Sequence, residues 1–148
     1  MTVTRREGWP TVKGLDRIDL RVEARPENVA VVRRALEGMG LPSGLLEDAK
    51  LLTSELVTNS VRHAGLRPED HIRVTAERTA GLRVVVLDGA SPAASTVAGA
   101  IRPAPGARSG FGLYLVDQIA SRWGTNLGGG RGFWFELRAP AGPSVGER

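Results

Sequence analysis

The chain has 148 residues, 41% of them hydrophobic and 24% charged, which is typical of one globular domain. It contains no cysteine, so disulfide bonds and thiolate metal sites are excluded. Its formal net charge is +4, but the longest basic runs are only Arg5-Arg6 and Arg33-Arg34. Because scattered charges favour a solvated surface over a basic stripe, we expect no nucleic-acid partner.

The N-terminal segment, residues 1–14, shows no apolar periodicity and is predicted to be a loose leader without a signal-peptide core. No apolar run approaches the roughly 20 residues of a membrane helix, so we expect a cytoplasmic protein without a membrane partner. Residues 17–23 alternate between apolar and charged side chains, which predicts a half-buried strand. Helical spacing then begins near Pro26 and ends over residues 38–42, which contain two glycines and a proline.

A second helix is predicted over residues 43–64, with Ser43 as its N-cap and Gly65 as its C-cap. Two strands follow, at residues 71–77 and 82–87, with a short turn between them. These two strands cannot be parallel, because a parallel crossover needs a dozen residues or more.

The segment 89–109 contains three prolines and few bulky side chains, which predicts a flexible lid. Helical spacing returns over residues 110–123. A hairpin is predicted from strands near 123–127 and at 132–138, and the tail over 140–148 is expected to be disordered.

This order of elements predicts a single α+β domain over residues 15–139. We expect a two-layer sandwich in which three helices cover one face of a mixed, mostly antiparallel sheet. The short turn between two neighbouring strands excludes a doubly wound parallel sheet.

One row of polar residues marks the second predicted helix. Glu55, Asn59 and His63 follow at intervals of four, so they form one stripe along its surface. An amide oxygen is a hard ligand that suits Mg²⁺, and a carboxylate one turn away can hold a water molecule beside the ion. The alternative is a solvent-facing polar stripe in which His63 only complements the helix dipole.

Asp88 directly follows the predicted buried strand, where a carboxylate needs a hydrogen-bond donor. The exocyclic amine of a purine is such a donor. The alternative is a simple turn formed by Asp88 and Gly89.

Gly110, Gly112 and Leu113 open the helix that follows the lid, and Arg108 lies just upstream. Glycine permits a close backbone approach, and the unpaired N–H groups of a helix N-terminus can bind phosphate. The glycine-rich stretch 128–132 is instead assigned to hairpin geometry, because tight hairpins select glycine. The chain contains no G-x-x-x-x-G-K-[ST] motif, so it is not a P-loop protein.

The order of these features resembles the GHKL superfamily of ATP-binding domains. More narrowly, the chain is similar to the anti-sigma-factor serine/threonine kinases, the stand-alone histidine-kinase-like ATPases of bacteria. Three segments carry this resemblance: SELVTNSVRHAG (54–65), SGFGLYLVDQIASRWG (109–124) and GFWFEL (132–137). It covers roughly residues 17–138 and departs from the usual pattern at Ser60, where alanine is common.

The resemblance implies that ATP and Mg²⁺ are the cofactors. Asn59 would coordinate Mg²⁺, and Glu55 would orient or deprotonate the attacking hydroxyl group. Asp88 would bind the adenine amine. The remaining implied ligand-binding residues would lie near the phosphates: Arg62, His63, Arg108, Gly110, Gly112 and Leu113.

The implied function is a regulator that sequesters a sigma factor and phosphorylates an antagonist protein on serine or threonine. The resemblance also suggests a homodimer. A second hypothesis is an ATP-dependent protein-binding module without kinase activity. A third, a small nucleic-acid-binding domain, is disfavoured because clustered arginines with exposed aromatic residues are lacking.

Overall fold

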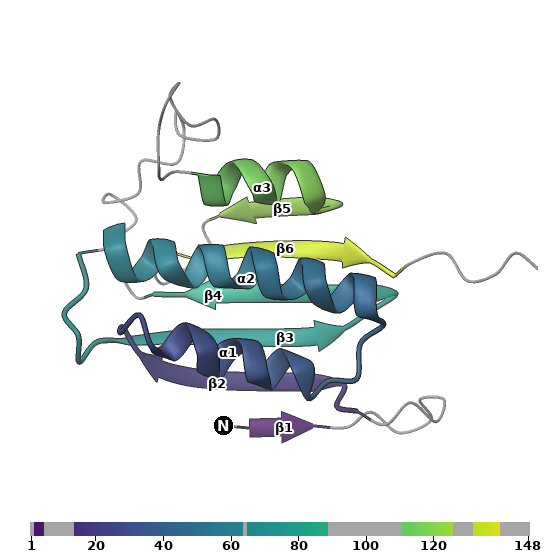
Figure 1. The fold of residues 1–148 in the computed structure, drawn as a ribbon, viewed down its shortest axis with the longest axis horizontal. Helices are drawn as coiled ribbons and strands as arrows, with labels where there is room; N and C mark the ends of the chain where they lie inside the picture. Colours follow the sequence, from purple (N-terminus) through teal and green to yellow (C-terminus); the bar gives the residue numbers. More distant parts are fainter. Residues whose placement is uncertain (1, 5–13, 64, 89–110, 126–131, 140–148) are drawn as a thin grey trace, which may run out of the picture.

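A computed structural model describes residues 2–4, 14–63, 65–88, 111–125 and 132–139. These residues form two layers, in which three helices pack on one face of a six-stranded sheet (Figure 1). The predicted α+β sandwich is therefore confirmed. The predicted lid and the predicted C-terminal tail lie outside the described residues.

The sheet has the strand order β1-β2-β3-β4-β6-β5. Its strands are β1 (Thr2–Thr4), β2 (Arg17–Glu23), β3 (His71–Arg78), β4 (Gly81–Leu87), β5 (Arg122–Thr125) and β6 (Gly132–Arg138). Every pairing is antiparallel, whereas a mixed sheet was expected. The last strand, β6, enters the sheet between β4 and β5 and runs opposite to both, so no parallel pair arises.

The edge strand β1 was not predicted. It falls within the range expected to be a loose leader, and it pairs with β2 from Thr2↔Asp19 to Thr4↔Arg17. Three residues are too few to show an alternating pattern that distinguishes a strand from a coil. The rest of the predicted leader up to residue 13 lies outside the described residues.

Helix α1 (Asn28–Glu37) and helix α2 (Ser43–His63) are joined by a short connection that contains Gly40 at φ 69°. The C-terminal end of α1 is held by Arg78, whose guanidinium donates to the carbonyl of Met39 at 3.2 Å. Helix α2 ends one residue before its predicted end, and the predicted C-cap Gly65 adopts φ 70°, a conformation that glycine reaches without strain.

Helix α3 (Phe111–Ile119) is shorter than the predicted helix over 110–123. The chain leaves the helix because the backbone N–H of Ser121 donates to the carbonyl of Glu136 at 2.9 Å, which joins the chain to β6. Trp123, which fits the helical spacing, therefore lies in β5. Pairing with a neighbouring strand has overridden the local pattern.

The hydrophobic core lies between the helices and the sheet. Alternate residues of each central strand point towards the helices, and Phe135 on β6 is fully buried. Helix α2 supplies Leu52, Leu56 and Val57, each at most 1% exposed. Burying one such side chain contributes about 1.5–3 kcal/mol, so this stripe fixes the axis and the rotation of α2.

The face of the sheet away from the helices carries charged side chains. Asp19 on β2 accepts two hydrogen bonds from the guanidinium of Arg73 on β3, at 2.9 and 2.6 Å. These bonds hold the pKa of the Asp19 carboxyl below its usual value. On the other half of this face, Arg83 stacks over Trp134 at 4.8 Å from the ring centroid. The exposed layer is thus held by cross-strand polar and cation–π pairs.

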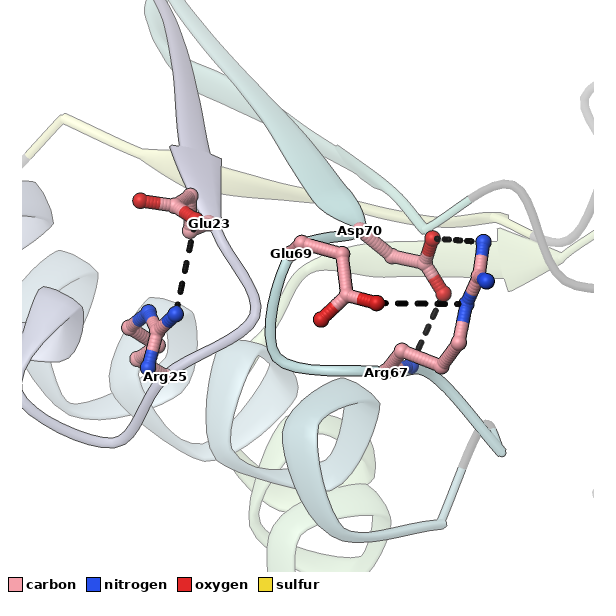
Figure 2. A network of polar contacts seen from close by, with 5 residues as sticks. All are labelled: Glu23, Arg25, Arg67, Glu69 and Asp70. Atoms are coloured by element: carbon pink, nitrogen blue, oxygen red, sulfur yellow. Dashed lines mark hydrogen bonds and ion pairs between the residues drawn. The ribbon is translucent and has the colours of Figure 1, made fainter.

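The connection from α2 to β3 is held by its own polar contacts (Figure 2). The side chain of Asp70 accepts a hydrogen bond from the backbone N–H of Arg67 at 2.8 Å, and Glu69 lies 3.6 Å from the same arginine's guanidinium. The carbonyl of Asp70 accepts a bond from the N–H of Ala24 at 2.7 Å. The chain leaving the C-terminal end of α2 is therefore fixed against the end of β2.

Candidate functional site

Three element ends lie at the same side of the molecule: the C-terminal end of α2, the end of β4 and the beginning of α3 (Figure 1). The first two are connected directly. Ser60, in the last turn of α2, donates a hydrogen bond from Oγ to Oδ2 of Asp88 at 3.0 Å. The last turn of α2 and the end of β4 are thus parts of one site.

Among the predicted site residues whose burial the structure describes, Asp88 is the most deeply buried, at 2% exposure. It follows the apolar strand β4, whose residues Val84 and Val86 are buried in the core. A buried carboxylate is costly unless donors surround it, and the hydroxyl of Ser60 is one such donor. A local turn would not need a hydrogen bond from another element, whereas the Asp88 carboxylate accepts one from α2.

Glu55 and Asn59 lie half-buried on α2, one helical turn apart. They flank the fully buried residues Leu56 and Val57 on the helix surface and are themselves only partly buried. The helix therefore presents the carboxylate and the amide at the margin of the core, where a ligand can reach them. Arg62 is exposed, and the side chain of His63, the last residue of α2, lies outside the described part.

The beginning of α3 places its first backbone N–H groups at the same side of the molecule. Gly112 lies in the first turn of this helix, and Leu113 anchors it to the core at 8% exposure. The structure thus assigns Leu113 a packing role beside any role in binding. Arg108 and Gly110 lie outside the described residues, so their predicted roles stay predictions.

The donor set on α2 fits a magnesium ion that arrives with phosphate groups. Mg²⁺ prefers hard oxygen ligands, keeps several waters and takes phosphate oxygens. Asn59 offers an amide oxygen at a half-buried position, and Glu55 offers a carboxylate on the adjacent turn. Across the described ranges, no group of three or more His, Cys, Asp and Glu side chains is arranged to hold a metal ion.

Ser60 is the site residue that sequence analysis missed. In the sequence it stands out only as a departure from the family pattern, yet it is 0% exposed and hydrogen-bonded to Asp88. One signal was present: Ser60 follows Leu56 by four residues and Val57 by three, so helical periodicity places a hydroxyl on the core face. A hydroxyl in that position needs a partner inside the protein.

Two open surface hollows lie elsewhere. One is lined by Asp48 and Ile119 together with the end of β6, and the other by the beginning of β4 and the end of β6. Because Gly81 pairs with Arg138 and Leu87 with Gly132, these hollows are at the opposite end of β4 from Asp88. None of the predicted site residues in the described part of the chain lines them.

No helix within the described segments is both long enough and apolar enough to cross a membrane.

Comparison with known proteins gives several serine-protein kinases as relatives. Over 66 residues the chain is 39% identical to the serine-protein kinase RsbW of Listeria monocytogenes serotype 4a (strain HCC23), which covers 42% of this chain and 41% of that protein. Over 53 residues it is 42% identical to the serine-protein kinase RsbW of Bacillus subtilis (strain 168), which covers 33% of each. The matches thus span about two fifths or less of these curated relatives.

A solved structure shares the fold. The crystal structure of the RsbU and RsbW domains of Rv1364c from Mycobacterium tuberculosis superposes with a TM-score of 0.60 and 20% sequence identity, over 82% of this chain and 32% of that one. A sequence model described as the histidine kinase-like ATPase domain matches residues 22–132, which include α2, β4, the lid range and α3. The chain belongs to the histidine kinase-like ATPase domain family.

Proposed function

We propose that this chain binds ATP with Mg²⁺ and acts as an anti-sigma-factor serine/threonine kinase, which sequesters a sigma factor and phosphorylates an antagonist protein. One observation carries the proposal. The buried carboxylate of Asp88 is hydrogen-bonded to α2 one residue away from Asn59. A group suited to a purine amine, at the end of β4, therefore contacts the same turn of α2 that carries a group suited to a hydrated cation.

The proposed binding roles follow from the chemistry of each side chain. Asp88 accepts a hydrogen bond from the adenine amine, in a buried position that excludes competing water. Asn59 holds Mg²⁺ through its amide oxygen. The first turn of α3, with Gly112, offers backbone N–H groups to the phosphates. We assign the same phosphate region to Arg62, His63, Arg108, Gly110 and Leu113.

The proposed reaction moves the γ-phosphoryl group of ATP to a serine or threonine hydroxyl of the antagonist. The bond to the β-phosphate oxygen breaks, a bond to the hydroxyl oxygen forms, and the products are ADP and the phosphoprotein. Glu55 orients that hydroxyl and accepts its proton. When bound, Mg²⁺ supplies positive charge that offsets the negative charge of the phosphates.

Phosphorylation would change which partner the chain holds. A phosphate adds about −1.5 to −2 charges at neutral pH, which alters the complementarity between the antagonist and this chain. The antagonist would then dissociate and leave the sigma factor bound. The names of the matched relatives support the kinase part of this proposal. We also propose that two copies of the chain form a homodimer, which sedimentation would detect as twice the mass of one chain.

The nucleotide proposal is tested by titrating ATP with and without Mg²⁺. Asn59→Ala is expected to lose the magnesium-dependent part of the affinity, because it loses the amide oxygen. Thr58→Ala, at the half-buried neighbouring position, is the matched control and is expected to keep that part. Magnesium-dependent affinity that survives in Asn59→Ala would contradict the metal role.

Kinase activity is tested separately with Glu55→Gln. Phosphoryl transfer to a candidate antagonist is expected to fall by about 10²–10⁴, which is the usual contribution of a general base. ATP binding is expected to persist, because glutamine keeps a side-chain oxygen that can hold a water molecule beside the ion. A wild-type chain that binds ATP but transfers phosphate to no antagonist would favour the binding module without kinase activity.

A further inference from the structure

The row of residues that carries Glu55 and Asn59 continues towards the N-terminal end of α2. Steps of four lead from Glu55 back to Leu51 and then to Glu47, so these residues form one stripe along the helix surface. Leu51 is 38% exposed, and the side chain of Glu47 is 70% exposed. This part of α2 therefore presents an exposed apolar side chain between two carboxylates.

Leu51 is not needed to hold α2 on the sheet, because Leu52 and Leu56 already supply the buried side of the helix. A single exposed leucine is ordinary on a protein surface, so its position carries the argument. It lies one helical turn from Glu55, the residue proposed to accept the proton of the attacking hydroxyl group. A protein substrate that reaches Glu55 therefore also reaches Leu51.

The carboxylates beside Leu51 are available to a cationic partner. The nearby Lys50 is engaged with α1, because its Nζ lies 2.9 Å from Oε2 of Glu37 and 3.8 Å from Oε1 of Glu47. Asp48 lines a surface hollow together with Arg138, whose guanidinium balances part of its charge. Glu47 thus keeps most of its charge for a basic side chain that arrives from outside.

The spacing of the stripe matches an extended peptide. Residues four apart on a helix are separated by about 6 Å along its axis. Side chains on one face of an extended strand recur at every second residue, about 6.6–6.8 Å apart. When a hydroxyl-bearing residue lies at Glu55, the side chain two positions away therefore lies over Leu51, and the side chain four positions away lies over Glu47.

We propose that the surface formed by Glu47, Leu51 and Glu55 is the docking surface for the segment of the antagonist that carries the phosphorylated serine or threonine. This segment is extended, with an apolar residue two positions and a basic residue four positions from the acceptor. The inference rests on the proposed function and adds the substrate sequence that the site prefers. Nucleotide at the Asn59 end of the row and protein at the Glu47 end then meet at Glu55.

The probe is the synthetic peptide Arg-Ala-Leu-Ala-Ser-Ala-Leu-Ala-Arg, whose symmetry lets it bind in either chain direction. It is titrated to millimolar concentration into the full ¹⁵N-labelled chain with Mg²⁺ and ADP, which fill the nucleotide site without phosphoryl transfer. Backbone amide resonances of residues 47–55 are expected to shift. A peptide with glutamate in place of both arginines is expected to bind at least about threefold more weakly, because it places like charges together.

The variants test the apolar and the charged contact separately. Leu51→Ala is expected to bind the arginine peptide about fivefold more weakly, because part of an apolar contact is lost. Val31→Ala, which truncates an equally exposed side chain on α1, is the matched control and is expected to bind as the wild type does. Glu47→Lys is expected to reverse the preference, so that the glutamate peptide binds more tightly than the arginine peptide. Damage to the fold of α2 would weaken both peptides and could not produce this reversal.

An ATP titration of the same samples separates this inference from the proposed function. If the wild type binds no ATP, the proposed function fails and the docking role fails with it. If ATP binds but the arginine peptide shifts no amide within residues 47–55, the docking role is refuted while ATP binding stands. Unchanged affinities of both peptides in Leu51→Ala and Glu47→Lys refute it as well. A reversed preference in Glu47→Lys, with wild-type binding by Val31→Ala, supports the docking surface.

Discussion

Leu56→Ala tests how strongly α2, the helix that carries Glu55 and Asn59, is anchored in the core. Leu56 is 1% exposed and lies between Glu55 and the rest of the polar row. The substitution removes three carbon atoms, worth about 2.4 kcal/mol at roughly 0.8 kcal/mol each. A residual cavity adds to this value, so the expected loss is about 3–5 kcal/mol in the free energy of unfolding.

The matched control is Leu51→Ala on the same helix. Leu51 is 38% exposed, so roughly three fifths of the transfer term applies, or about 1.5 kcal/mol, and solvent fills the space left behind. Urea unfolding measures both losses. In a chain of this size each kcal/mol shifts the melting temperature by about 2–4 °C, so Leu56→Ala is expected to melt ~6–20 °C lower. Equal losses in the two variants would refute the inferred packing of α2.

Three further predictions concern the sheet. Because the pKa of Asp19 is lowered in the folded state, its ion pair stabilises the fold above the unfolded pKa of about 3.8, and this stabilisation disappears as the pH falls through the folded pKa. The free energy of unfolding of Asp19→Asn, measured as a function of pH, is therefore expected to fall less steeply at acid pH than that of the wild type. Gly124→Ala places a Cβ 2.7 Å from Nε1 of Trp134, so the indole must move; a loss of about 1–3 kcal/mol in urea and an altered tryptophan emission spectrum are expected. Gly81→Ala places a Cβ against the carbonyl oxygen of Leu137, and because backbone within a paired strand cannot yield, this variant is expected to unfold at lower urea than Gly124→Ala.

The fold was predictable wherever periodicity is long and clear. The second helix ends at His63, one residue before its predicted end, and β6 covers Gly132–Arg138 as predicted. The errors arose where long-range pairing decides the structure. Trp123 fits a helical face, yet the bond from Ser121 to β6 takes the chain out of the helix first. No local signal in three residues reveals β1.

The arrangement of the candidate site was predictable only in part, and the roles of its residues stay predictions. Glu55, Asn59 and Asp88 were identified by type and order, and the structure brings α2 and Asp88 together. The bond from Ser60 to Asp88 joins residues 28 positions apart, so spacing along one helix cannot reveal it. Arg78 shows the same limit, because its burial depends on carbonyl groups at the end of α1.

The position of β6 also has a consequence for the chain as it leaves the ribosome. This strand pairs with β4 along its whole length, but it is the last described strand to be synthesised. Until Arg138 emerges, β4 remains an apolar edge with open backbone groups, which is a surface that invites pairing with other nascent chains. Chaperone occupancy is therefore expected to be highest between the synthesis of β4 and that of β6.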